Sequence, residues 1–325
     1  DELRAKKQMK SKEYDGIEHK IKEIRSEIRK EERKYAARAQ VIGTTISRAT
    51  IDPMFEDRQF DLVMFDEVSM AYVPQVIAAA ALAKEKFMCV GDFRQLAPIS
   101  QCSDAHVLQV DIFSYLQIVD GKGSMYWHPW LVMLNEQRRM APAISEFPSK
   151  FIYNRLLKDN AEVINGKKKR DNDLVIKSAP LPGDALNLID LAGTYCAADK
   201  NTDGSRFNIL SAVISFSTAV KAEQNHIETV GIITPYAAQV RLIRAMLKDY
   251  YTKGTTNVSC ATVHQFQGSE SDVIVFDAVE SYPKSAVGYL MGKEPNQVAR
   301  LVNVAITRGK GKVITVANAR FWENV

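Results

Sequence analysis

The fold of this chain is decided by residues 60–100, which read FDLVMFDEVSMAYVPQVIAAAALAKEKFMCVGDFRQLAPIS. Residues 62–65 are a continuous apolar run, which predicts a strand buried on both faces of a parallel sheet. Asp66 and Glu67 follow at once, at the sheet edge where such folds bind their ligands. One carboxylate there can hold Mg²⁺ and the second can activate a water. The dipeptide alone would indicate no more than a polar loop.

A second strand in this stretch is predicted at residues 86–90 and leads to Gln95, whose neutral amide can contact a terminal phosphate. The carboxyl ends of neighbouring parallel strands meet at one edge of a sheet, so we expect Gln95 beside the two carboxylates. The stretch therefore predicts the catalytic edge of a sheet that hydrolyses nucleotides.

Composition limits the class of protein. The chain has 325 residues, 46% of them hydrophobic and 25% charged, which is typical of a globular protein with room for two domains. No apolar run approaches the roughly 20 residues that span a bilayer, so no membrane partner is expected. Four cysteines and five histidines are scattered without a Cys-x-x-Cys pair, which argues against zinc and a disulfide framework. We expect a cytoplasmic protein, or a nuclear one if its source is eukaryotic.

Residues 1–40 carry the whole net charge of +4, with 13 Lys or Arg against 9 Asp or Glu, which leaves 30 of each sign elsewhere. Apolar residues recur there mainly in three- and four-residue steps, at Tyr14, Ile17, Ile21, Ile24, Ile28 and Tyr35. This spacing predicts a helical arm of coiled-coil type. Two interpretations stay open: a solvated arm of a helical hairpin, or a basic stalk that grips nucleic acid.

From residue 41 onward, predicted strands alternate with amphipathic helices, which indicates parallel α/β sheets. The predicted strands are residues 41–46, 62–65, 86–90, 131–134, 186–191, 230–234, 258–263, 272–278 and 313–317. These are too many strands for one compact sheet, and the Gly-containing stretch 121–129 predicts a break. We therefore expect an arm (1–40), an incomplete first domain (41–125) and a second domain (126–325).

Further segments supply cations and polar groups for the same chemistry. Arg138 and Arg139 follow a predicted strand and can reach phosphate oxygens. Arg308 ends a predicted helix, where a cation could equally well neutralise the helix dipole. Two other strands end in ITPY and TVHQFQGSE, which suit contact with nucleic acid, although His264 could be an ordinary surface histidine. Each segment is weak alone, and their number and order carry the prediction.

Taken in order, six segments resemble the motifs of superfamily 1 helicases, most closely the up-frameshift-like branch. They read FDEVSM, GDFRQLAP, EQRRMAP, ITPY, TVHQFQGSE and NVAITRGK, and the resemblance covers residues 41–325. It implies two RecA-like domains that bind ATP and Mg²⁺ between them, with single-stranded DNA or RNA running across both. Pro98 stands where the other large branch carries a base-stacking aromatic stretch, which favours movement from 5′ to 3′.

The resemblance also implies roles for single residues. Asp66 would hold Mg²⁺, Glu67 would activate water and Gln95 would sense the γ-phosphate, while Arg139 and Arg308 would act as arginine fingers. The other residues that it places at the nucleotide are Arg138, Gln267, Gly268 and Glu270. The residues that it places toward the nucleic-acid track are Thr45, Thr234, Pro235, Tyr236, Thr262 and His264.

The sequence departs from the family in two places. No Gly-x-x-x-x-Gly-Lys-Ser/Thr occurs in it, so the phosphate loop (Walker A segment) is expected before residue 1 or on another polypeptide. Arg138 stands where relatives often have a tyrosine against the adenine, and a guanidinium can stack there too.

These features predict the C-terminal part of an ATP-dependent helicase, inactive alone because it lacks the phosphate loop. A rival interpretation is a non-catalytic nucleic-acid clamp or scaffold that retains the fold. A third is that a partner chain supplies the missing segment.

Overall fold

A computed structural model describes residues 2–56, 58–100, 106–119, 128–252, 254, 256–288, 291 and 295–324. The chain separates into two compact units. The first comprises the chain up to Asp66 together with Pro74–Val90, and the second comprises Glu67–Val73 together with the chain from Gly91 onward. Among the described helices, none combines the length and the apolar composition that crossing a membrane requires.

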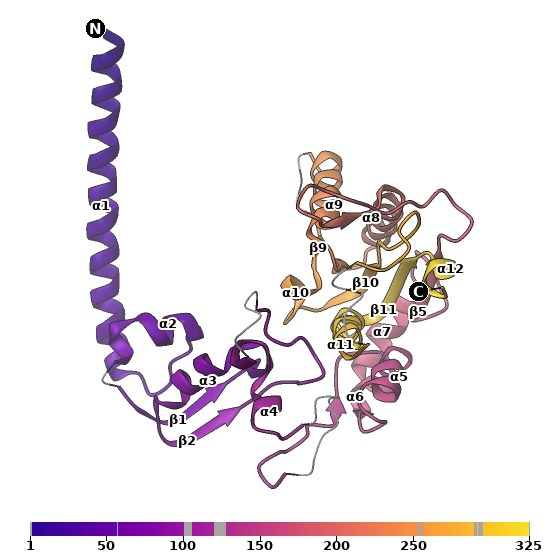
Figure 1. The fold of residues 1–325 in the computed structure, drawn as a ribbon, viewed down its shortest axis with the longest axis horizontal. Helices are drawn as coiled ribbons and strands as arrows, with labels where there is room; N and C mark the ends of the chain where they lie inside the picture. Colours follow the sequence, from indigo (N-terminus) through magenta and orange to yellow (C-terminus); the bar gives the residue numbers. More distant parts are fainter. Residues whose placement is uncertain are drawn as a thin grey trace. The chain divides into compact units, whose positions relative to one another are not determined.

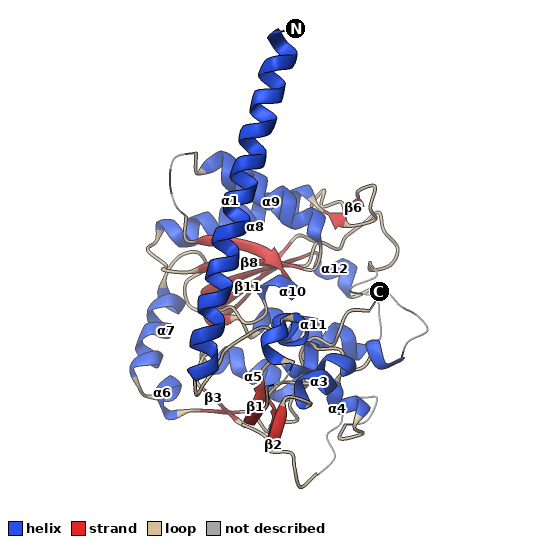
Figure 2. Cartoon of the chain, turned by 90° about the vertical axis from the view of Figure 1, so that its left-hand side faces the viewer, coloured by secondary structure: helices blue, strands red, loops and turns tan. Residues whose placement is uncertain are grey.

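The first unit begins with α1 (Glu2–Arg38), the long helix predicted for the arm (Figures 1 and 2). Its six apolar seam residues are open to solvent, with exposed fractions from 42% to 77%. The foot of the helix is fixed by Arg48, whose Nη2 lies 2.6 Å from Glu32 Oε2, and by Arg58, whose Nη2 donates to the Ala39 carbonyl at 3.0 Å. The helical arm is confirmed, and the choice between hairpin arm and stalk stays open.

β1 (Phe60–Phe65) and β2 (Ala83–Cys89) form a parallel pair joined through α3 (Val73–Ala80). Both strands are confirmed, but the expected burial of the first strand on both faces is wrong. Leu62 is 46% exposed and Met64 is 62% exposed. The reason is that the described part of this sheet has two strands, which leave one apolar face uncovered.

Two further strand predictions are wrong. Residues 41–45 are irregular and lead into α2 (Ile46–Ile51), because Thr45 caps that helix: its Oγ1 accepts the backbone N–H of the third residue on, at 3.3 Å. Residues 131–134 pair with no described strand, and two of their apolar side chains are 80% and 85% exposed, so no core holds them in place.

The second unit is built on a five-stranded parallel sheet in the order β5-β11-β10-β8-β9. The bounds are Leu186–Asp190 (β5), Val230–Thr234 (β8), Val258–Thr262 (β9), Ser271–Asp277 (β10) and Gly309–Ala317 (β11). All five strands were expected from the sequence, and their parallel pairing confirms the α/β fold class. β8 is buried at every position, which is why VGIIT shows almost no polar alternation.

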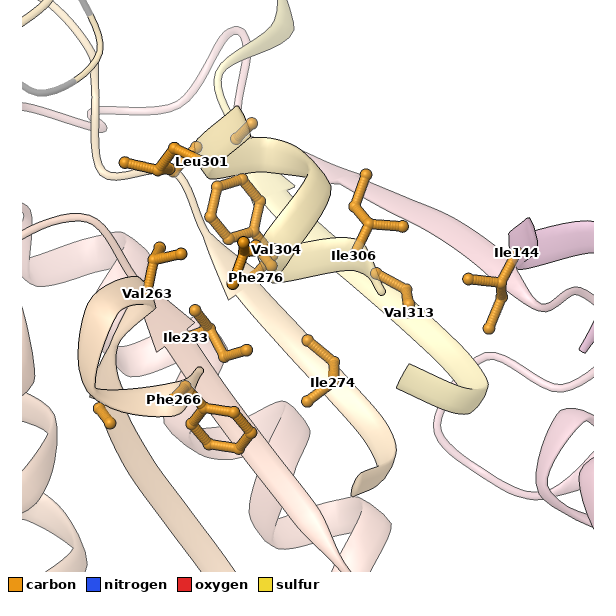
Figure 3. Close-up of a cluster of buried hydrophobic side chains, with 14 of the residues drawn as sticks. Ile144, Ile233, Val263, Phe266, Ile274, Phe276, Leu301, Val304, Ile306 and Val313 are labelled. Atoms are coloured by element: carbon orange, nitrogen blue, oxygen red, sulfur yellow. The ribbon is translucent and has the colours of Figure 1, made fainter. Parts of the chain in front are cut away.

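Helices pack on both faces of this sheet. The described helices of the unit are α4 (Ile112–Tyr115), α5 (Pro142–Phe151), α6 (Ala161–Ile164), α7 (Lys167–Lys177), α8 (Ile209–Gln224), α9 (Ala237–Tyr250), α10 (Val263–Phe266), α11 (Pro295–Ile306) and α12 (Ala319–Trp322). Alternate residues of β10 enter two separate cores. Ile274 and Phe276 pack in the core shown in Figure 3, with residues of α10 and α11, whereas Val273 and Val275 pack in the other, with residues of α8 and α9.

Short elements complete the described chain. They are the strand pairs β3 (Glu136–Gln137) with β4 (Lys158–Asp159) and β6 (Asp199–Lys200) with β7 (Arg206–Phe207), and the single 3₁₀ turns η1 (Pro53–Phe55), η2 (Val68–Met70) and η3 (His106–Leu108). The predicted break at 121–129 lies almost wholly outside the described residues. The division into 1–40, 41–125 and 126–325 therefore stays a prediction.

Candidate functional site

The two carboxylates after β1 stand in a strained turn. Asp66 ends the first unit and Glu67 opens the second. Glu67 has φ 53° and ψ 35°, in the left-handed region that residues with a Cβ rarely occupy. A conformation of this kind costs on the order of 1–3 kcal/mol and tends to occur at functional sites. The strained backbone of this turn therefore makes Glu67 a candidate functional residue.

The loop after β2 packs closely on the segment that Glu67 begins. A Cβ on Gly91 would lie 3.1 Å from the Ser69 nitrogen and 3.1 Å from Val68 Cγ1. A glycine at this position allows the two segments to approach each other. Residues 91–95, at the start of this loop, accordingly belong to the second unit, as Glu67 does.

Gln95 is held at both ends of its amide. Its Nε2 donates to Asp92 Oδ2 at 3.0 Å, and its Oε1 accepts from Arg308 Nη2 at 3.3 Å. Asp92 also accepts the backbone N–H of Arg94, at 2.9 Å. The structure thus brings Gln95 together with Arg308, which lies 213 residues further along the chain.

Arg308 is a buried cation. Its exposed fraction is 3%, and its Nε donates to the Val304 carbonyl at 3.2 Å. In the part of the chain that the structure describes, no carboxylate forms an ion pair with it. Burial, and next the charge of Arg139, lower the pKa of Arg308 to about 10, so the guanidinium stays charged at neutral pH. A buried charge is costly without a counter-charge, and an anionic ligand would supply one.

Arg139 is the second cation of this cluster. Its Nε donates to Glu270 Oε2 at 2.7 Å, and its Nη1 donates to the Thr307 carbonyl at 3.2 Å. Its side chain is 35% exposed. Arg139 and Glu270, both predicted at the nucleotide, are therefore in direct contact. The bond to the Thr307 carbonyl brings Arg139 close to Arg308, the next residue in the chain after Thr307.

Gln267 connects the strand-end motif after β9 to Glu67. Its Nε2 donates to Glu67 Oε2 at 3.2 Å. Its Oε1 is buried and has no hydrogen-bond partner among the described residues. Gly268 follows with φ +80°, a left-handed conformation that favours glycine. Gln267 can thus orient the Glu67 carboxylate and still present an acceptor to a ligand.

Arg138 forms none of these contacts. Its side chain is 67% exposed and lies 3.3 Å from Glu136 Oε2. Its carbonyl accepts a hydrogen bond from Lys168 Nζ at 2.6 Å. The contact of Arg138 with a nucleotide base therefore stays a prediction.

The residues predicted to follow a nucleic-acid track are spread over both units. Thr45 caps α2 in the first unit. Thr234 and Thr262 are cross-strand neighbours at the carboxyl ends of β8 and β9. Thr262 Oγ1 caps α10 by accepting the Gln265 N–H at 3.3 Å, whereas the buried Thr234 Oγ1 has no partner among the described residues. His264 lies half-buried on α10.

Tyr236 and the neighbouring Pro235 are buried in the second unit. The Tyr236 ring is 4% exposed, and its hydroxyl donates to the Glu280 carboxylate. Glu280 also accepts from Arg206 Nη1 and from the Gly288 N–H, the latter at 2.8 Å. Burial, and next the hydrogen bond to Glu280, raise the pKa of the Tyr236 hydroxyl. A base could stack on this ring only if the side chain left the core.

Two polar residues of the cluster could not be singled out from the sequence as site residues. Tyr153 Oη donates to Asp92 Oδ2 at 2.5 Å, and Asn303 Nδ2 donates to Tyr153 Oη at 2.9 Å. Asn303 is the first residue of the NVAITRGK segment, so the sequence indicated the region in which it lies but not the residue itself. Tyr153 lies in FIYNRLL, which carries no motif.

A cluster of metal ligands is absent from the described ranges, where no three His, Cys, Asp or Glu side chains are placed to hold an ion. Mg²⁺ needs fewer protein ligands, because it keeps several waters and takes one or two carboxylates together with substrate phosphates. Asp66, directly after β1, is a carboxylate that suits such a site.

Comparison with known proteins shows the family. Residues 124–320 match a family model described as an AAA domain, and residues 1–102 match a second model with the same description. The chain is 29% identical to the DNA polymerase alpha-associated DNA helicase A of Schizosaccharomyces pombe, over 92% of this chain and 44% of that protein. It is 28% identical to the regulator of nonsense transcripts 1 of Dictyostelium discoideum, over 87% of this chain and 20% of that protein.

Among solved structures, the PRRSV helicase matches 79% of this chain and 35% of its own, at 12% identity. The TM-score is 0.37. The chain spans less than half the length of the curated relatives just named.

Proposed function

Because this chain belongs to the up-frameshift-like branch of the superfamily 1 helicases, a group of AAA-domain proteins, we propose that it works in an ATP-driven translocase. The proposed reaction is ATP hydrolysis coupled to 5′ to 3′ movement along single-stranded DNA or RNA. The activity and partners of the whole protein are part of this proposal, since the chain spans 44% of the S. pombe relative.

The observation that carries the proposal is the buried charge of Arg308 beside Arg139, which the carboxylates of Glu67 and Asp92 offset only in part. Among the described residues no carboxylate pairs with it, and Arg139 lies close enough to lower its pKa. Two neighbouring cations repel each other, so one multiply charged anion stabilises both. A triphosphate is such an anion, and its transferred phosphoryl group carries charge that guanidinium groups stabilise.

The surrounding side chains then take separate roles. Glu67 accepts the proton of the attacking water, and the Gln267 amide orients its carboxylate. Gln95 donates one amide hydrogen to Asp92, and its amide faces Arg308, where it would sense the γ-phosphate. Arg308 acts as an arginine finger together with Arg139.

We propose Asp66 as the protein ligand of Mg²⁺, which when bound neutralises charge on the phosphate oxygens. A Walker A segment, from the same or another polypeptide, would complete the site, because the sequence contains no such segment. Arg138, Gly268 and Glu270 remain candidates for nucleotide contact, the last through its ion pair with Arg139.

For the nucleic-acid track, we propose the strand-end pair Thr234 and Thr262, with His264 on α10. The unpartnered Thr234 hydroxyl among the described residues supports this choice. Thr45 and Tyr236 are weaker candidates, since one caps a helix and the other is committed to Glu280. The proposed compartment is the cytoplasm, or the nucleus of a eukaryotic source.

Arg308→Ala in the full-length protein tests the proposal. We expect nucleic-acid-stimulated ATP turnover to fall by on the order of 10³ to 10⁵, with single-strand affinity measured without nucleotide unchanged. Arg244→Ala is the matched control, because Arg244 Nε also donates to a backbone carbonyl, that of Cys260 at 2.8 Å, outside the cluster. A non-catalytic clamp would give the reverse: unchanged turnover, weaker binding and a shallower salt dependence.

A further inference from the structure

A chain of hydrogen bonds ties the loop after β2 to α5 and α11 within the second unit. Tyr153, two residues beyond α5, donates from Oη to Asp92 Oδ2 at 2.5 Å. Asn303 on α11 is fully buried, and its Nδ2 donates both to Tyr153 Oη at 2.9 Å and to the Arg94 carbonyl at 3.1 Å. Two elements from distant parts of the sequence therefore hold one short loop.

Asp92 passes this restraint on to Gln95. The oxygen that accepts from Tyr153 also accepts from Gln95 Nε2, at 3.0 Å. A glutamine amide has one oxygen and two N–H groups at opposite ends. Because Asp92 takes an N–H, the Gln95 oxygen is directed to Arg308 Nη2, 3.3 Å away. The Gln95 side chain also forms a hydrogen bond with the Tyr153 hydroxyl, so Tyr153 restrains the amide directly as well as through Asp92. Without Asp92 in place, the amide could rotate and present its two ends in either order.

The Tyr153 hydroxyl is suited to act as a permanent donor. Burial, and next the Asp92 carboxylate, raise its pKa above the ordinary value, so it keeps its proton throughout the range in which proteins fold. The Asp92 carboxylate therefore always has the Tyr153 hydroxyl as a hydrogen-bond donor. A phenylalanine at this position would keep the ring and remove the hydrogen bonds of the hydroxyl with Asp92, Asn303 and Gln95.

We propose that Tyr153, held by Asn303, is a positioning residue that acts through Asp92 to fix Gln95 against Arg308. The proposal rests on the proposed function, because it assigns these residues to ATP turnover. It adds to the resemblance a residue that lies in none of the six motif segments. Tyr153 makes no contact with the nucleotide in this scheme, so its effect falls on the orientation of Gln95.

The expected effect is on turnover more than on binding. Misplacing a catalytic group by about 1 Å through a distant mutation costs on the order of 10²-fold. We expect Tyr153→Phe in the full-length protein to lower kcat of nucleic-acid-stimulated ATP hydrolysis by about 10- to 100-fold. KM for ATP and single-strand affinity should stay within about threefold, since nucleotide binding rests on other groups.

A matched control is Tyr251→Phe. The Tyr251 hydroxyl also donates to a carboxylate, that of Glu223, and it lies at the end of α9 outside the cluster. This control should retain wild-type kcat. Tyr153→Phe combined with Gln95→Ala provides the second measurement: if Tyr153 acts through Gln95, it should cost little once Gln95 has been removed.

The outcomes separate the inference from the proposed function. A full-length wild type without nucleic-acid-stimulated ATP turnover overturns both. An active wild type overturns the inference alone in either of two cases: if Tyr153→Phe matches Tyr251→Phe in kcat, or if it costs as much in the Gln95→Ala background as in the wild type. A fall in kcat that vanishes in the Gln95→Ala background supports it.

Discussion

Lys312 is a fully buried lysine in β11, and its contribution to the free energy of unfolding should change with pH. Its Nζ donates to the Ser178 carbonyl at 2.5 Å and to the Pro180 carbonyl at 2.9 Å. No carboxylate among the described residues forms an ion pair with it. Burial lowers the pKa of Lys312 from 10.5 to about 8. The folded chain therefore binds this proton less tightly than the unfolded chain.

The sign and size of the effect follow from the two pKa values. Between about pH 8 and 10.5 the unfolded chain holds more protons at Lys312 than the folded chain does, so this residue makes folding more favourable as the pH rises. The full shift corresponds to about 3 kcal/mol. Between pH 7 and pH 9 the gain in unfolding free energy is about 1 kcal/mol, because only part of that window is crossed.

The test compares the wild type with Lys312→Met by urea unfolding at pH 7 and pH 9. We expect the difference in unfolding free energy to move by about 1 kcal/mol in favour of the wild type at the higher pH. Subtracting the unfolding free energy of the variant from that of the wild type cancels the contributions of tyrosines and cysteines, which titrate in both proteins. Lys310→Met is the matched control, since Lys310 lies on the same strand and pairs with Asp272 at 2.6 Å. A difference that does not change with pH would refute the reasoning, because it would mean that the two carbonyls replace water completely around the ammonium.

Glu67→Gln in the full-length protein should lower ATP turnover by about 10²- to 10⁴-fold and leave nucleotide binding intact, because the amide still accepts from Gln267 but cannot act as a base. Turnover assays and titration with a fluorescent nucleotide measure the two effects. Near-normal turnover would show that Glu67 is not the base. Gly231→Ala should destabilise the chain by about 1–3 kcal/mol in urea unfolding, since its Cβ would lie 2.5 Å from Phe266 Cζ. Gly254→Ala, with no atom within 4 Å of the added Cβ, is the control, and equal stabilities for the two variants would contradict the packing argument.

The sheet of the second unit could be predicted because its central strands contain continuous apolar runs, VGII in β8 and VIVF in β10. β8 and β10 are buried along almost their whole length, and this burial is written directly into their sequences. Predictions failed where a single contact decided the structure. The apolar character of residues 41–46 suggested a strand, but the Thr45 hydroxyl starts a helix there. Leu62 and Met64 were expected in a core, and the two-stranded sheet has no layer to cover them.

The same distinction applies to the candidate site: the sequence indicates residues that follow strands, but not residues that are placed by one long-range contact. Glu67 and Gln95 were singled out because they follow neighbouring parallel strands, and the structure joins them to Gln267 and Arg308, two other predicted site residues. Their roles stay predictions.

Tyr153 could not be singled out, because its contact with Asp92 spans 61 residues and depends on how α5 packs. For Tyr236, an aromatic after a strand suggested base stacking, which stays a prediction. Nothing in the sequence indicated that a carboxylate 44 residues further along accepts a hydrogen bond from its hydroxyl in the core.

Two interpretations of Arg308 were open from sequence: neutralisation of a helix dipole, or an arginine finger. The dipole interpretation has some support, because Arg308 Nε donates to Val304 at the end of α11. That interaction is worth about 0.3–1 kcal/mol at an exposed helix end. Arg308 is 3% exposed, and the cost of burying an ion is several kcal/mol. The neighbouring charge of Arg139 adds to that cost, and the charges of Glu67 and Asp92 reduce it. The dipole and the carbonyls are therefore too weak to offset the burial of Arg308 by themselves, and the charges of Glu67 and Asp92 supply a further part. The arginine finger stays a prediction, and it is the interpretation that adds an anionic ligand as counter-charge.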